Sequence, residues 1–163
     1  MNGHNPLLED VLGVYADTLK HIREFMESIP DERMAEQPGG VINHPAWTLG
    51  HLHSASGLLL TLLDAAPPAP AEESRKFGPG SKPVADRSAY ASKESLLASL
   101  MERHVQVEAA VRANHRSHFP KPPPEFLRAF APTVGRISIY LLAAHEPYHL
   151  GQLMPWKRAA GLI

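Results

Sequence analysis

Hydrophobic side chains recur at alternating spacings of three and four residues in four stretches of the chain. This spacing places them on one face of an α-helix, which is typical of helices that pack around a shared core. The pattern predicts helices from about Pro6 to Ser28, Pro45 to Ala66, Lys93 to His115 and Val134 to Ala160. No stretch alternates at every second residue for long enough to predict a strand, so we expect an all-α protein.

Two long, proline-rich connections separate these helices, at residues 66–92 and 116–132. Four amphipathic helices in a chain of 163 residues predict a single domain over 1–163, built as a four-helix bundle with a long crossover between helices 2 and 3. Such a crossover allows the second and third helices to run parallel. Loops of this length often cover a functional site, and the 66–92 connection is the candidate cover.

Charge and composition exclude several classes of protein. The chain carries 16 Lys and Arg against 17 Asp and Glu, a balance that argues against a nucleic-acid partner. The apolar run at 58–63 is far shorter than the ~20 residues that cross a bilayer, so we expect no membrane partner. The N-terminal residues lack a secretory signal pattern, and we expect a cytoplasmic protein. The absence of cysteine excludes disulfides, cysteine metal sites and a thiol nucleophile from the protein.

Ten histidines are the distinctive feature of the composition, because histidine is the borderline metal ligand left to a chain without cysteine. His145 and His149 are four residues apart and share one helix face. Spacing alone is a weak indication, since ten histidines among 163 residues give ~0.6 such pairs by chance. Pro147 lies between them and interrupts a helix at a cost of about 3 kcal/mol. This cost favours a shaped site, with a simple packing kink as the alternative.

A third histidine strengthens the metal hypothesis. His51 lies on the apolar face of the second predicted helix, and three neutral imidazoles with open positions are typical of a catalytic metal site. His104, on the inner face of the third helix, is the substitute ligand, and we interpret Glu146 as a charge at the bundle edge. We expect the remaining histidines outside the site, at the surface, at a helix edge or in loops: His4, His21, His53, His115 and His118.

Two segments carry sequence patterns that occur together in one known family. HPAWTLGHLHSAS, at residues 44–56, matches the family pattern of an aromatic residue followed by Gly-His-Leu on the second helix. HEPYHLGQLMPWKRAAG, at residues 145–161, matches the family pattern His-x-x-x-His-x-Gly-Gln with a basic stretch and a glycine after it. With these two segments the chain resembles the DinB-like family, and the resemblance implies a four-helix bundle and a divalent metal ion, nickel or zinc. By position, the implied ligands are His51, His145 and His149.

Characterised members of that family include transferases and isomerases that use small thiols such as bacillithiol, mycothiol or glutathione. The leading hypothesis is therefore a metal-dependent transferase that acts on a small-molecule substrate with a low-molecular-weight thiol. Tyr148 and His44 are candidates for proton transfer or substrate orientation. The alternatives are a metal-dependent hydrolase, a non-catalytic helical bundle that binds a ligand or stores a metal, and a structural protein with surface histidines. The resemblance also implies a homodimer.

Overall fold

The computed structural model describes residues 5–163, so that His4 lies outside the described residues. Every regular element in this range is helical, which confirms the predicted all-α class. The longer elements are α1 (Pro6–Glu27), α2 (Pro45–Leu62), α3 (Ala71–Phe77), α4 (Lys93–His118), α5 (Val134–Tyr140), a π-helical turn η5 (Leu141–His145) and α6 (Glu146–Ala159). Short 3-10 turns lie between them: η1 (Asp31–Arg33), η2 (Pro38–Gly40), η3 (Arg87–Ala89) and η4 (Glu125–Leu127).

Capping side chains set where the predicted helices begin. The side-chain oxygen of Asn5 accepts a hydrogen bond from the Leu8 N–H at 3.4 Å, and Ser92 and Thr133 cap α4 and α5 in the same way. Such a bond satisfies one of the N–H groups that the first turn leaves unpaired. The predicted helix ends are less accurate. Helix α2 ends before the predicted residue 66, and α4 continues beyond the predicted residue 115.

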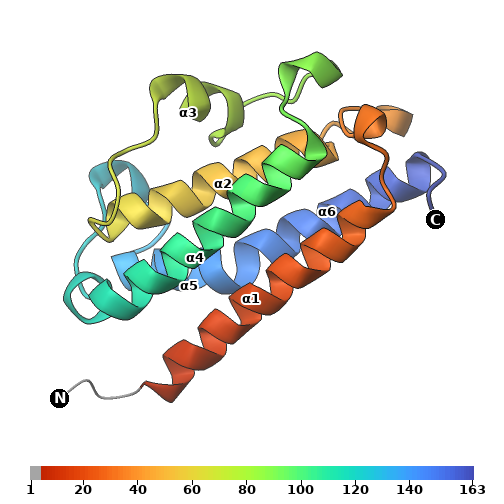
Figure 1. Ribbon diagram of the computed structural model, residues 1–163. Helices are drawn as coiled ribbons and strands as arrows, with labels where there is room; N and C mark the ends of the chain where they lie inside the picture. Colours follow the sequence, from red (N-terminus) through yellow and green to blue (C-terminus); the bar gives the residue numbers. More distant parts are fainter. Residues whose placement is uncertain (1–4) are drawn as a thin grey trace.

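The long helices lie side by side in Figure 1. Helices α2 and α4 run in the same direction and pack against each other, whereas α1 and α6 run in the opposite direction. The connection between α2 and α4 returns the chain to the end at which α2 starts, an arrangement that the long crossover allows. It contains α3, a helix that the sequence pattern did not predict, and α3 lies over α2.

Two clusters of buried apolar side chains join the helices. The first contains residues from α1, α2, α4 and the C-terminal segment, a name we use for α5, η5 and α6 together. Among these residues are Leu12, Leu59, Val107 and Ile137. The second takes others from the same four segments, among them Ile22, Leu52, Leu100 and Trp156. Along α4 and the C-terminal segment, buried polar residues lie between the two clusters: His104, His145, Glu146 and His149. Across residues 5–163, none of the helices combines the length and the apolar character that a membrane span needs.

The predicted fourth helix is helical throughout residues 134–159, but a π-helical turn that the sequence pattern did not predict divides it. Helix α5 ends at Tyr140, the chain passes through the π-helical turn η5, and α6 begins at Glu146. The wider turn places Pro147 in the first turn of α6. A proline is tolerated there because the N–H groups of a first turn have no partner inside their helix. Single π turns are frequent at functional sites, and this one ends at His145.

Removal of a core side chain tests the packing of α4. Leu100 is fully buried in the second cluster, so the Leu100→Ala variant should lose about 2–5 kcal/mol of the free energy of unfolding. Val105 lies on the same helix with 70% of its surface exposed, and Val105→Ala should change this free energy by less than about 0.5 kcal/mol. Urea denaturation measures both values. Equal losses in the two variants would contradict the core assignment.

Candidate metal centre

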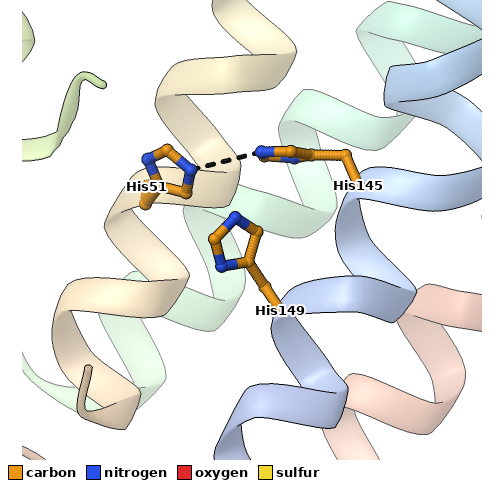
Figure 2. Close-up of side chains that lie close together, drawn as sticks. All are labelled: His51, His145 and His149. Atoms are coloured by element: carbon orange, nitrogen blue, oxygen red, sulfur yellow. Dashed lines mark hydrogen bonds between the residues drawn. The ribbon is translucent and has the colours of Figure 1, made fainter. Parts of the chain in front are cut away.

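Three buried histidine rings converge between α2 and the C-terminal segment. His51 comes from α2, His145 ends the π-helical turn, and His149 lies in the first turns of α6. One nitrogen of each ring lies within 4.8 Å of the other two, and Figure 2 shows the rings pointing toward one another. The sequence therefore predicted the members of the group, and Pro147 leaves the spacing of the His145–His149 pair intact. Within residues 5–163, no other three histidine or carboxylate side chains gather in this way.

The separations between the rings are compatible with one shared ion. The Nε2 atoms of His51 and His145 are 3.2 Å apart. The ring centroid of His149 is 4.6 Å from each of the other two. An ion about 2.0–2.1 Å from both Nε2 atoms would make an angle of about 100° with them, close to the tetrahedral value. The donor set therefore fits a divalent ion that retains an open coordination position.

The protonation of His51 is fixed by a main-chain carbonyl. Its Nδ1 lies 2.6 Å from the carbonyl oxygen of Phe77, in α3. A carbonyl oxygen can only accept a hydrogen bond, so Nδ1 carries the hydrogen and the neutral ring has a free lone pair on Nε2. That lone pair points toward His145. A histidine ligand held in this way by a second group is the usual arrangement at protein metal sites.

Burial keeps all three imidazoles neutral at pH 7. Desolvation, together with the proximity of His149 and of His51, lowers the pKa of His145 to about 3. Desolvation, together with the proximity of His51, lowers the pKa of His149 to about 4. The pKa of His51 is lowered by desolvation, against the opposing hydrogen bond to Phe77. Because a metal binds the neutral imidazole, the group is ready for an ion without losing protons first.

A buried pair beside the centre was missed in the sequence. His104 Nε2 lies 2.9 Å from Glu146 Oε1, and each side chain is 2% exposed. The interpretation of Glu146 as a charge at the bundle edge was therefore wrong. The C-terminal segment is buried on two faces, so that His145 faces α2 while Glu146 faces α4. His104, the substitute ligand of the sequence analysis, is instead bound to Glu146.

Helix α1 contributes Tyr15, which packs against this pair. The ring of Tyr15 stacks on His104 with centroids 3.7 Å apart, and the Tyr15 hydroxyl lies 3.0 Å from Ser56 Oγ. Burial raises the pKa of Glu146, while the hydrogen bond from His104 acts in the opposite direction. Burial also raises the pKa of Tyr15. The helical spacing already placed Tyr15 and His104 on inward faces, and a buried histidine needs a polar partner. The inward position predicted for His104 could therefore have indicated a buried polar partner, which is Glu146.

The two predicted proton-transfer residues occupy different environments. His44 is fully buried at the start of α2, where its Nδ1 accepts the Trp47 N–H at 3.2 Å. Its Nε2 donates to the carbonyl oxygen of Val84 at 3.1 Å, so both ring nitrogens are bound to the main chain. Tyr148 is 59% exposed, and its ring centroid is 5.2 Å from that of His149. Roles for these two residues in catalysis stay predictions.

Among residues 5–163, the histidines expected outside the centre lie outside it. His21 is exposed, and His53 and His115 are half-buried. His118 differs from its expected surface position, because it is buried at the end of α4, with its Nε2 2.8 Å from a carboxylate oxygen of Asp64. The charge of this acceptor explains how a histidine can be buried at the end of a helix.

Comparison with known proteins gives one match. A family described as the DinB superfamily matches residues 15–153, a range that contains all three histidines of the centre. The comparisons found no match among curated proteins or solved structures.

Acidification should destabilise the metal-free protein through the centre. In the folded state, the pKa values of His145 and His149 are about 3 and about 4. In the unfolded chain these groups titrate near pH 6.5, so the unfolded state binds more protons as the pH falls below that value. The free energy of unfolding should therefore fall by on the order of a few kcal/mol between about pH 7 and about pH 4.5. Urea denaturation of chelator-treated protein measures it.

The matched control for that experiment is the His145→Gln/His149→Gln variant. It retains the other titrating groups but lacks the two most strongly shifted ones, so its stability should depend less on pH. If wild type and variant lose stability in parallel, these two histidines do not carry the assigned pKa shifts.

The His104–Glu146 pair should show strong coupling in a double-mutant cycle. His104→Leu leaves the Glu146 carboxylate buried without a partner and should cost about 3–5 kcal/mol of stability. Replacing both residues by leucine removes the buried polar groups together and should recover much of that loss. Denaturation of the single and double variants in the presence of a chelator measures the coupling. Additive losses would show that the two side chains act independently.

Proposed function

The chain belongs to the DinB superfamily, and on that premise we propose that it is a metal-dependent enzyme with a divalent ion on His51, His145 and His149. The observation that carries this proposal is the convergence of three buried, neutral imidazoles from two facing helical segments. We propose that the ion is nickel or zinc. We also propose that the four helical segments form a four-helix bundle of the kind that the resemblance implies.

In the proposed reaction, the sulfur of a low-molecular-weight thiol forms a bond to an electrophilic atom of a small-molecule substrate. The bond from that atom to a leaving group breaks, and the thiol proton passes to the leaving group or to solvent. When bound, a divalent ion supplies Lewis acidity and lowers the pKa of a thiol or water beside it. The chain contains no cysteine, so the sulfur must come from a second small molecule. The protein's own contribution is to keep the imidazoles neutral, to fix the free lone pair of His51 on Nε2, and to exclude bulk water from the rings.

Of the two predicted proton-transfer residues, Tyr148 is the better placed for substrate. Its ring lies beside His149 and more than half of its surface is exposed, so a ligand can reach the hydroxyl. His44 holds the start of α2 with both ring nitrogens. We therefore assign Tyr148 the role of substrate orientation and expect His44 to act through the position of the helix.

The partners and the location follow the same proposal. We expect a small-molecule substrate and a low-molecular-weight thiol as ligands, no nucleic-acid or membrane partner, a homodimer and a cytoplasmic protein. The near balance of 16 basic and 17 acidic residues supports the first of the two exclusions. Size-exclusion chromatography with light scattering measures the oligomeric state directly.

Metal analysis is the first test of the proposed function. After loading with nickel or zinc and removal of excess metal, the protein should retain one ion per chain, measured by inductively coupled plasma mass spectrometry. His51→Ala should lose most of the bound metal because two imidazoles remain. His21 is exposed, and His21→Ala should bind as the wild type does. Wild type that retains no stoichiometric ion, or full retention by His51→Ala, would rule out the centre.

A substrate screen with the loaded protein separates the alternatives. Consumption of an electrophilic substrate only when a small thiol is present supports the transferase. Cleavage of esters without a thiol supports the metal-dependent hydrolase instead. A stoichiometric ion with neither activity supports the non-catalytic bundle that binds or stores metal, and would overturn the transferase proposal for the compounds tested.

A further inference from the structure

A segment of the crossover contacts the metal centre directly. Residues 71–81, which we call the α3 strap, comprise α3 and the four residues after it. Figure 1 shows α3 lying over α2, the helix that carries His51. A role of this strap at His51 rests on the proposed metal site.

The first contact of the strap sets the tautomer of a ligand. The carbonyl oxygen of Phe77 accepts the hydrogen bond from His51 Nδ1 at 2.6 Å. A shift of the strap away from α2 would break this bond. The ring could then rotate or carry its hydrogen on Nε2, and the lone pair that faces His145 would be lost. Groups that hold a histidine ligand in this way typically contribute 10- to 100-fold to metal affinity.

A glycine allows the strap to approach α2 so closely. A Cβ atom at Gly50 would lie 2.5 and 2.6 Å from two carbons of the Phe77 ring, and closer still to a third. No side chain fits this space unless the ring moves. Gly50 also precedes His51 in the chain, so the ring of Phe77 occupies the site of the missing side chain while its carbonyl oxygen reaches the next residue.

Trp47 joins the strap to the same ligand by a second route. Its Nε1–H lies 3.1 Å from the Lys76 carbonyl oxygen and 3.1 Å from Ser81 Oγ, and it donates to these acceptors. Its ring stacks on that of His51, with centroids 4.8 Å apart and planes 8° from parallel. Displacement of the strap would therefore disturb both the hydrogen bond and the aromatic surface that hold the His51 ring.

We propose that the α3 strap orients His51 for metal binding, with Phe77 and Gly50 as positioning residues. Docking of the strap and binding of the ion are then energetically coupled, each favouring the other by the same factor. The position of the strap over α2 would therefore change with the occupancy of the metal site. The sequence pattern of long amphipathic helices does not include α3. The strap acts on His51 through the main-chain carbonyl oxygen of Phe77.

A pair of glycine variants on α2 tests this proposal. Gly50→Ala should displace Phe77 and weaken nickel or zinc binding by about 10- to 100-fold in competition with a chromophoric chelator. Gly57→Ala is the matched control, because a Cβ there meets only Arg103 atoms, at 3.8 Å or more, and should leave affinity unchanged. Adding Phe77→Ala to Gly50→Ala removes the clash and should restore much of the lost affinity. Wild-type affinity in Gly50→Ala, or no recovery in the double variant, would overturn the proposal.

The tautomer of His51 supplies a readout that needs no metal. In ¹⁵N NMR spectra of the metal-free wild type, His51 should carry its hydrogen on Nδ1, whereas Gly50→Ala should show a mixture of tautomers. An unchanged tautomer would contradict the role of the strap even if affinity falls. Failure of wild type to bind metal would refute the proposed function instead, while this spectrum would still test the strap.

A second variant covers the case in which Gly50→Ala does not fold. Trp47→Phe retains a ring against His51 but removes the N–H donor to Lys76 and Ser81. It should weaken metal binding by about 3- to 10-fold, the equivalent of one hydrogen bond. Circular dichroism confirms folding before each measurement. Unchanged affinity in folded Trp47→Phe would count against the strap.

Discussion

The need to keep buried imidazoles uncharged and hydrogen-bonded is the constraint on which the rest of this structure depends. Four of the six histidines buried within residues 5–163, His51, His104, His145 and His149, lie with the buried Glu146 beside the apolar clusters of the helical core. A buried charge without a partner is costly, so each of these groups must be neutral, paired or bound to an ion. The structure divides them into a pair, His104 with Glu146, and three rings that face one another.

One segment serves both groups because neighbouring residues of a helix point about 100° apart. His145 and Glu146 are neighbours in the chain, yet one faces α2 and the other faces α4. Pro147 lies in the first turn of α6, directly after the π-helical turn. His149 follows His145 at the four-residue spacing that allows two histidines to bind one metal ion. The hydrogen bond between Glu146 and His104 fixes the start of α6 next to the ligands. Stability of the core and geometry of the centre therefore depend on the same few residues.

The sequence predicted the features that follow a periodic pattern, such as the long helices, better than the features that depend on a single contact. Helical spacing and capping residues located the long helices, and the resemblance selected His51, His145 and His149 from ten histidines. Glu146 was assigned to the bundle edge because its direction was judged from one helix, although burial depends on all the helices around it. The strap escaped prediction because Phe77 acts through a main-chain carbonyl, which no side-chain pattern records.

The most direct test of the central claim is a crystal structure of nickel- or zinc-loaded protein with data collected at the absorption edge of the metal. The account predicts one anomalous peak between the three rings, bound by Nε2 of His51 and of His145 and by a nitrogen of His149 at about 2.0–2.1 Å. A peak elsewhere on the chain, with the three rings free of metal, would contradict it.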